Sequence, residues 1–296
     1  MNKHAYLIMA HGNWNILKKL IFLIDNEKND IYLHIDVKAT AFPQEIKDIV
    51  HKSKLVLVDS QKVFWADYSI VQVELKLLAE ARNSGKYSYY HLLSGVDLPI
   101  KSTREIYRFF ENSGKNFIGI VPNEVYYSVR RVKFYHMLLS NRYYRSMKIL
   151  KVIDRGSEYI QRIFGVNRLK DTDWKIIDGW QWFSITDEFC NYILKNKKKI
   201  EKMFSYTVSC DELVLQTLAY NSEFYSTLYD TSDLKKGSMR YIDWTRGKPY
   251  TWGKSAEDYK LLMESPYMFA RKFDENHMDF VNRIFEEIDR RNKNDE

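Results

Sequence analysis

The chain has 296 residues, 45% hydrophobic and 29% charged, which is enough apolar material for the core of a single α/β domain. Its net charge of +7 favours anionic partners: phosphates, a nucleotide, nucleic acid or an acidic membrane surface. No run approaches the ~20 apolar residues of a membrane-spanning helix, which excludes an integral membrane protein, and the two cysteines form no zinc-type array.

Short apolar runs alternate with segments of helical periodicity in the first third of the chain. The longest helical segment places Tyr68, Val71 and Leu75 on one face, with Asp67 as its expected N-cap. This alternation predicts a parallel sheet with helices on its faces. The expected strands cover residues 4–10, 31–35, 55–58 and 89–93, and the expected helices cover residues 14–24, 43–50 and 67–82.

The turns that follow these strands are the expected place for a ligand. In open parallel sheets, ligands bind at the carboxyl ends of the strands. The turns concerned cover residues 11–13, 36–38, 59–66 and 94–99. Side chains in them are therefore the first candidates for a binding site.

Residues 123–170 are basic and aromatic, and residues 147–164 predict one or two amphipathic helices. We interpret this segment as an insertion on the α/β core. Two interpretations stay open: a solvated helical excursion, or a surface that contacts an acceptor or a membrane. Its basic residues are Arg130, Arg131, Lys133, Arg142, Arg145, Lys148, Lys151, Arg155, Arg162, Arg168 and Lys170.

Beyond the insertion, the pattern continues without an internal repeat or a low-complexity linker. We therefore expect residues 1–296 to form one domain. The predicted strands cover residues 180–185 and 239–242, the predicted helices cover residues 186–200, 211–219 and 280–288, and an apolar run occupies residues 267–270.

Motifs for nucleotide and metal binding are sparse. Glycine-rich cradles of the Rossmann and P-loop types are absent, so a nucleotide would bind without one. Asp171 and Asp173 have the spacing of a metal-binding pair, but no buried strand precedes them, and we interpret them as surface residues. A lone carboxylate, Asp97, follows the fourth strand, and one carboxylate is a poor site for Mg²⁺ or Mn²⁺. We predict no bound metal and no cofactor.

Cations near the end of the chain are candidates for stabilising phosphate charge. Arg271 and Lys272 directly follow the apolar residues 267–270, so a strand or turn would hold them at a fixed point. The alternative is a solvated surface pair. The possible partners upstream are Arg240, Arg246 and Lys248.

Two further pairs of side chains are candidates for contact with a substrate. Asp211 and Glu212 lie at a predicted helix start, where Asp211 would stabilise the helix terminus and Glu212 could face a cleft as a base. Trp180 and Trp182 lead into a predicted strand, and their rings suit either stacking on a sugar or packing in the core.

Five motifs occur in order along the chain: AYLIMAH at residues 5–11, IYLHIDVK at 31–38, YHLLSGVDLPIK at 90–101, SCDE at 209–212 and FARKFD at 269–274. Together they resemble the core-2/I-branching β-1,6-N-acetylglucosaminyltransferase family, which also includes the peptide O-xylosyltransferases. The resemblance implies a GT-A-like fold with a mixed, mainly parallel central sheet. It also implies an inverting, metal-independent glycosyltransferase that uses a UDP-sugar, with N-acetylglucosamine as the first choice.

The resemblance also implies roles for single residues. Glu212 matches the catalytic base of a Ser-Pro-Asp-Glu motif, in which Cys210 replaces the proline here. Lys272 matches a diphosphate contact that it shares with an upstream cation, one of Arg240, Arg246 and Lys248, and Arg271 is a further candidate for it. Met9, Ala10, His11 and Asp36 match contacts to the nucleotide, and Asp97, Asp211, Trp180 and Trp182 are candidates for contact with the sugar or the acceptor.

The expected partners are a nucleotide-sugar donor and a glycan or lipid-linked glycan acceptor, with peripheral membrane contact and no nucleic acid. Because the chain lacks the anchor and the cysteines of the family's eukaryotic members, it resembles a bacterial-type, cytoplasmic member that assembles a surface polysaccharide. The alternatives are a non-catalytic glycan-binding or scaffold protein with the same fold, and a nucleic-acid binder that uses the basic insertion.

Overall fold

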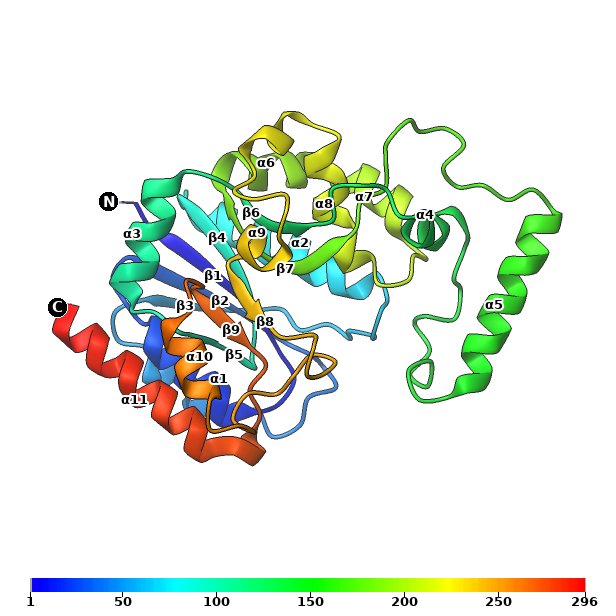
Figure 1. The fold of residues 1–296 in the computed structure, drawn as a ribbon. Coiled ribbons are helices and arrows are strands. Elements are labelled where there is room, and N and C mark those ends of the chain that lie inside the picture. The colour runs from blue at the N-terminus through cyan, green and yellow to red at the C-terminus, as the bar shows by residue number, and fades with distance from the viewer. Residues whose placement is uncertain (1, 296) are drawn as a thin grey trace.

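A six-stranded sheet forms the centre of the computed structural model, which describes residues 2–295 (Figure 1). Four strands run parallel: β1 (His4–Ala10), β2 (Asn29–Ile35), β3 (Lys54–Val58) and β4 (Tyr89–Ser94). β7 (Gly179–Thr186) pairs antiparallel with both β4 and β6 (Phe117–Ile120), and the strand order is β3-β2-β1-β4-β7-β6. The expected mixed, mainly parallel sheet is confirmed.

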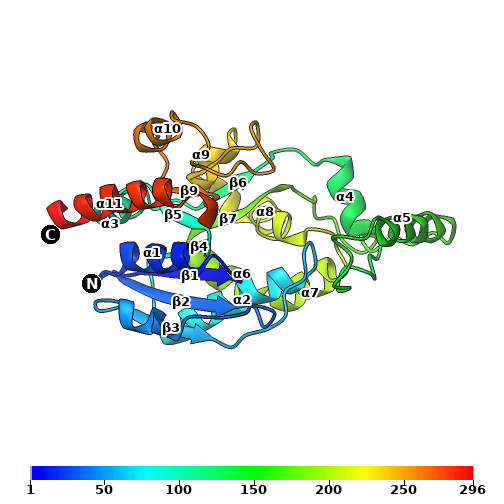
Figure 2. The same ribbon diagram turned by 90° about the horizontal axis from the view of Figure 1, so that it is seen from below.

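Alternation of side chains along the strands divides the core into two layers. On β1, Ala5 and Leu7 face one apolar cluster, whereas Tyr6 and Ile8 face the other. The first cluster contains residues of α2 (Ser69–Ser84), and the second contains residues of α1 (Trp14–Ile24). Figure 2 shows the sheet between α2 on one side and α1 and α11 (Met278–Asp295) on the other. Helices therefore cover both faces of the sheet.

The helices predicted in the first third are present, with two local differences. The segment predicted as a helix over residues 43–50 is a 3-10 helix, η1 (Gln44–Ile49). Asp67 is not the N-cap of α2, because the chain turns one residue later and Tyr68 occupies that position. The Asp67 carboxylate instead accepts a hydrogen bond of 2.8 Å from the Ser69 amide, which closes a short turn.

Two helices predicted as continuous in the second half are interrupted. The segment 186–200 is divided at Asn196 into α6 (Asp187–Lys195) and α7 (Lys197–Phe204). The segment 211–219 is divided at Leu213 into a 3-10 turn, η2 (Cys210–Glu212), and α8 (Val214–Tyr220). Because of the second interruption, Asp211 and Glu212 lie in the η2 turn and not in the first turn of α8.

A small second sheet lies beside the first and carries the basic motif. It consists of β5 (Asp97–Pro99), β9 (Phe269–Arg271) and β8 (Arg240–Ile242), in the order β5-β9-β8. The predicted strand at residues 239–242 and the apolar run 267–270 correspond to β8 and β9. α11 is longer than predicted, because ion pairs such as Lys293 with Asp289 continue it beyond the apolar face.

The predicted insertion contains two helices, α4 (Tyr126–Lys133) and α5 (Lys148–Ile163), and α5 projects away from the sheets (Figures 1 and 2). Within residues 2–295, none of the helices combines the length and the apolar character that crossing a membrane requires. Besides β5, β6 and α4, the elements that the sequence pattern did not predict are α3 (Thr103–Ser113), η3 (Glu223–Thr227), α9 (Leu234–Ser238), α10 (Asp258–Glu264) and η4 (Glu275–His277).

Gly179 marks a close approach between β7 and β6, and replacing it tests this packing. A Cβ atom at Gly179 would lie 2.0 Å from the carbonyl oxygen of Gly119, so Gly179→Ala is expected to lower the free energy of unfolding by about 1–3 kcal/mol or more. Urea denaturation measures the change. Gly156→Ala is the matched control, because its Cβ would meet no atom within 4 Å on α5. Equal stability of both variants would contradict the packing.

Candidate active site

The carboxyl ends of β1, β2 and β4 meet at one edge of the large sheet. The Met9 carbonyl accepts a hydrogen bond of 3.0 Å from the Gly95 amide, and the Ala10 carbonyl accepts one of 3.0 Å from the Asp36 amide. A Cβ atom at Gly95 would approach Cβ of Ala10 to 3.0 Å, so only glycine fits comfortably there. His11 follows on the exposed side. The structure thus brings four predicted nucleotide contacts to one edge.

Asp36 is buried at this edge, and its carboxylate is held by the turn that follows β2. It accepts a hydrogen bond of 2.9 Å from the Lys38 amide, and its second oxygen lies 3.4 Å from the Lys38 ammonium. This local turn fixes the orientation of the carboxylate before any ligand arrives.

The antiparallel strand β7 adds aromatic side chains to the same edge. Because β7 pairs with β4 with Ser184 opposite His91, its first residues lie beside the carboxyl end of β4. The guanidinium of Arg271 lies 3.8 Å from the centre of a Trp182 ring, which is a stacking contact. Trp180 instead lines a cavity of about 590 Å³ together with Pro122 and Trp244. The two predicted tryptophans therefore have different surroundings.

Asp97 is buried and engaged by the protein on both oxygens. Ser94 donates to it from its amide at 2.9 Å and from its hydroxyl at 2.7 Å, and Nε of Arg271 lies 3.5 Å from Oδ1. Sequence analysis placed Asp97 in contact with the sugar or acceptor, whereas in the structure its carboxylate orients Arg271 and the turn after β4.

Lys272 presents a cation that has no counterion among residues 2–295. Throughout residues 2–295, its ammonium group makes neither a hydrogen bond nor an ion pair. Its backbone is held on both sides, because its amide donates to the Tyr250 carbonyl at 3.4 Å and its carbonyl accepts from the Trp252 amide at 3.0 Å. A half-buried, positioned ammonium of this kind is suited to a phosphate group.

The three upstream cations have unequal access to such a phosphate. Arg240 is fully buried and donates to the Phe183 carbonyl at 2.8 Å, so the protein itself occupies its guanidinium. Arg246 forms ion pairs with Asp243 and Asp258, which neutralise it. Lys248 is exposed. Arg240 therefore serves the packing of the two sheets, beside the pair of Asp97 and Arg271.

Glu212 is held by a buried arginine that sequence analysis did not single out. Nη2 of Arg131 lies 3.0 Å from Oε2 of Glu212, and Nη1 lies 3.2 Å from Oδ2 of Asp178. The same guanidinium donates to the carbonyls of Val208, at 2.7 Å, and Ser209. The side chain of Arg131 is 6% exposed and that of Glu212 is 42% exposed, so the arginine positions a carboxylate that remains accessible.

Neighbouring acids change the protonation of Glu212. Burial, followed by repulsion from the Asp211 carboxylate, raises the pKa of Glu212 to about 7, against the opposing attraction of Arg131. Burial also raises the pKa of Asp211, and that of Glu74 on α2 well above its usual range. Glu74 accepts a hydrogen bond of 2.8 Å from the amide group of Gln181 on β7. Asp211 is itself buried, whereas the side chain of Glu212 is partly exposed.

The structure provides a carboxyl group with a raised pKa, which Arg131 holds, and a pair of cations at the end of β9, where Arg271 stacks on Trp182 of β7. A carboxylate of that pKa can accept a proton from a hydroxyl group, and the cations can stabilise an anionic leaving group. Among residues 2–295, no group of three or more histidine, cysteine, aspartate or glutamate side chains could hold a metal ion. The arrangement is that of a group-transfer enzyme.

The mixed sheet and its flanking helices define a GT-A-like glycosyltransferase fold. A family model described as "Branch: Core-2/I-Branching enzyme" matches residues 4–261. The chain therefore belongs to the Core-2/I-Branching enzyme family, which indicates a glycosyltransferase.

Relatives with curated names support the same class. The chain is 24% identical to a human N-acetyllactosaminide beta-1,6-N-acetylglucosaminyl-transferase over 92% of this chain and 68% of that protein. It is 26% identical to a bovine beta-1,3-galactosyl-O-glycosyl-glycoprotein beta-1,6-N-acetylglucosaminyltransferase over 91% and 65%, respectively. It is 20% identical to rat xylosyltransferase 2 over 91% of this chain, which is 32% of that protein. The chain thus spans about two thirds of the first two relatives and about a third of the last.

The burial of Glu74 near Asp211 can be tested through the pH dependence of stability. The unfolded chain releases this proton near pH 4.5, whereas the folded protein retains it, so the folded state binds more protons above that pH. Stability is therefore lost as pH rises, by about 1.4 kcal/mol per unit while Glu74 stays protonated. Glu74→Gln removes this component, and its stability relative to the parent protein should increase from pH 5.5 to 8 in urea titrations.

The control for this measurement is Glu80→Gln, an exposed position on the same helix. It should leave the pH dependence of the parent protein unchanged. A Glu74→Gln variant with the same pH slope as the parent would show that Glu74 ionises normally in the fold.

Proposed function

We propose that the chain is an inverting, metal-independent glycosyltransferase that moves a sugar from a UDP-sugar to a hydroxyl group of a glycan acceptor. The observation that carries the proposal is the Glu212 carboxyl group, which Arg131 positions while burial and Asp211 raise its pKa to about 7. A base of that pKa is half ionised at neutral pH and still strong enough to assist deprotonation of an alcohol.

In the proposed step, the acceptor oxygen attacks the anomeric carbon of the donor sugar. The bond from that oxygen to carbon forms as the bond from carbon to the diphosphate oxygen breaks, with inversion at the carbon. Glu212 takes the hydroxyl proton, and the electron pair of the broken bond leaves with UDP. The negative charge therefore moves from the Glu212 carboxylate to the departing diphosphate.

Stabilisation of that diphosphate is assigned to Lys272, with Arg271 beside it. The proposal is supported by the free ammonium group of Lys272 and by the stacking of Arg271 on Trp182. Metal independence is supported by Asp97, the carboxylate after β4, because Ser94 and Arg271 already occupy its oxygens. Two cations can take the role that a divalent ion has in other phosphate transfers.

The donor is assigned as UDP-N-acetylglucosamine, since the first relatives are named as N-acetylglucosaminyltransferases. UDP-xylose is the second choice, from the name of the more distant relative. As part of the same proposal, the acceptor is a surface glycan or its lipid-linked precursor assembled in the cytoplasm. The net charge of +7 supports it, because anionic lipid-linked acceptors attract a basic protein.

Replacing the proposed base tests the mechanism. Glu212→Gln should lower kcat by about 10²–10⁴ while the affinity for the UDP-sugar is kept, because the amide cannot accept the proton. Initial rates with the preferred donor and calorimetric titration of UDP-sugar measure the two quantities. Glu223→Gln is the control, as Glu223 is exposed on η3 away from these contacts. Full turnover by Glu212→Gln would refute the assignment.

The pH profile gives an independent check on the same residue. Turnover should rise with pH through about 7, since only the ionised carboxylate accepts a proton. Asp211→Asn removes the neighbouring negative charge and lowers the pKa of Glu212, so the rising limb should move to lower pH. An unchanged limb would mean that another group controls the profile.

The metal-free model has its own test. Lys272→Ala should reduce kcat by about 10²–10³, and EDTA should leave the turnover of the parent protein unchanged. Lys260→Ala on α10 is the control, because it removes an exposed lysine outside the site. Assays across a panel of UDP-sugars, with and without EDTA, separate the outcomes. Loss of turnover with EDTA would assign the diphosphate charge to a metal ion.

A further inference from the structure

The α5 helix attaches to the protein through its polar side. Asp154 and Glu158 are its buried residues, each 4% exposed. Asp154 lies 2.7 Å from Nδ1 of His136 and accepts a hydrogen bond of 3.2 Å from Tyr144, and Glu158 pairs with Arg130 at 2.7 Å. Asp154 and Glu158, which would normally face water, therefore bond to residues of the segments packed against α5.

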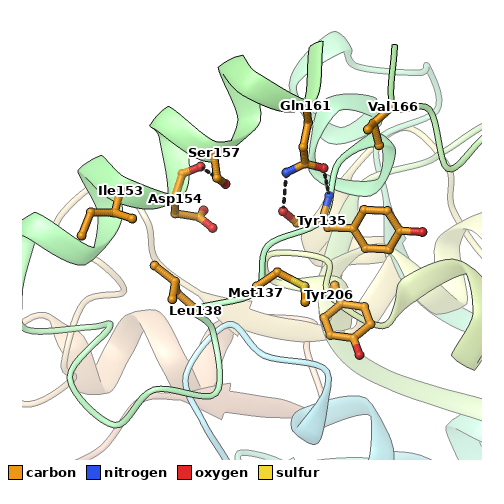
Figure 3. Close-up of a pocket in the computed structure, with 9 residues that line it drawn as sticks. All are labelled: Tyr135, Met137, Leu138, Ile153, Asp154, Ser157, Gln161, Val166 and Tyr206. Atoms are coloured by element: carbon orange, nitrogen blue, oxygen red, sulfur yellow. Dashed lines mark hydrogen bonds between the residues drawn. The ribbon is translucent and has the colours of Figure 1, made fainter. Parts of the chain in front are cut away.

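Figure 3 shows the same orientation at the cavity beneath α5. Asp154, Ser157 and Gln161 lie on the side of the helix that faces the cavity, and the Gln161 amide exchanges two hydrogen bonds of 2.8 Å with the backbone of Tyr135. Ile153 borders this space at the edge of the helix. The inner side of α5 is thus polar and bonded.

The outward side of α5 is apolar. Ile149, Val152, Ile160 and Ile163 are separated by three or eight residues and so share one helix face. A surface helix of a globular protein normally buries this stripe, and here the polarity is inverted. The apolar side chains of α5 and its end that are each more than half exposed are Ile149, Val152, Ile153, Tyr159, Ile160, Ile163 and Phe164.

A row of basic residues borders this apolar face. Lys148, Lys151, Arg155 and Arg162 follow one another at intervals of three, four and seven residues, which places them along one flank of the helix. Glu158 lies 3.5 Å from Arg162 and so offsets that charge, whereas neither acid of α5 forms an ion pair with Lys148, Lys151 or Arg155. The outer surface of α5 therefore combines apolar and positive side chains.

We propose that α5 binds an anionic lipid surface, lying in its plane with the apolar face in the boundary between headgroups and acyl chains. Charge complementarity favours this occupant: the basic flank would meet lipid phosphates while the isoleucines enter the apolar layer. A second copy of the chain fits less well, because a two-fold contact between α5 helices would bring equal basic flanks together. The proposal stands independently of the donor, acceptor and mechanism.

The contacts of α5 with α4 would link a membrane bound at α5 to the candidate active site. Arg130 and Arg131 are neighbours on α4, and Arg130 holds Glu158 of α5 while Arg131 holds Glu212. A membrane that anchors α5 is therefore joined to the candidate base through two consecutive residues. Substrates carried by that membrane would be presented beside the site.

Co-sedimentation with vesicles tests the proposal on the full chain. The parent protein should bind vesicles of phosphatidylcholine mixed with phosphatidylglycerol, and bind pure phosphatidylcholine much more weakly. Val152→Glu/Ile160→Glu should abolish binding, and Lys148→Ala/Arg155→Ala should weaken it about 30-fold. Lys197→Ala/Lys198→Ala, which removes two exposed lysines of α7, is the matched control and should bind like the parent.

All the substituted side chains are exposed, so circular dichroism and thermal unfolding should match the parent protein. UDP-sugar binding should also be unchanged, which separates loss of the lipid contact from loss of the active site. No binding of the parent to anionic vesicles, or equal loss in the α7 control, would overturn the proposal. So would a dimer in light scattering that Val152→Glu/Ile160→Glu dissociates while vesicle binding persists.

Discussion

The buried guanidinium of Arg131 is the contact on which the candidate site depends. It joins α4, the segment before β7 and the η2 turn by pairing with Asp178 and Glu212 and by donating to the carbonyls of Val208 and Ser209. A buried charge is tolerated only when such partners satisfy it, and loss of one partner typically costs about 3–5 kcal/mol. Glu212, the proposed proton acceptor, is therefore positioned by the same interaction that secures the insertion to the core.

Opposing charges act on the two groups of the candidate site, the Glu212 carboxyl group and the cations Arg271 and Lys272. On one side, burial and the Asp211 carboxylate favour the protonated form of Glu212, while Arg131 favours the ionised form. On the other side, Asp97 holds Arg271, and the ammonium group of Lys272 has no partner in the described part of the chain. A base with a raised pKa and a cation without a partner among residues 2–295 suit the proposed reaction, in which negative charge passes from the base to a leaving phosphate.

The insertion also separates polar from apolar side chains, on the two sides of α5. On α5 the acids Asp154 and Glu158 bond inward, and the apolar and basic residues face out. The helix is held by a few strong polar contacts instead of by burial of its apolar stripe. This attachment leaves the apolar face of α5 exposed. Through Arg130 and Arg131, α4 contacts both Glu158 of α5 and Glu212.

The sequence by itself determined five of the six strands of the large sheet, all but β6, together with the helices beside the first four and the turns at their carboxyl ends, because hydrophobic periodicity and turn chemistry are local. It also indicated Glu212 and Lys272 through ordered motifs. Only the tertiary structure decided that Arg240 is occupied in the core, that Asp97 orients Arg271, and that Arg131 holds Glu212. These contacts join segments far apart in the chain, so no spacing encodes them. The inverted α5 depends likewise on partners outside the helix, which periodicity alone cannot locate.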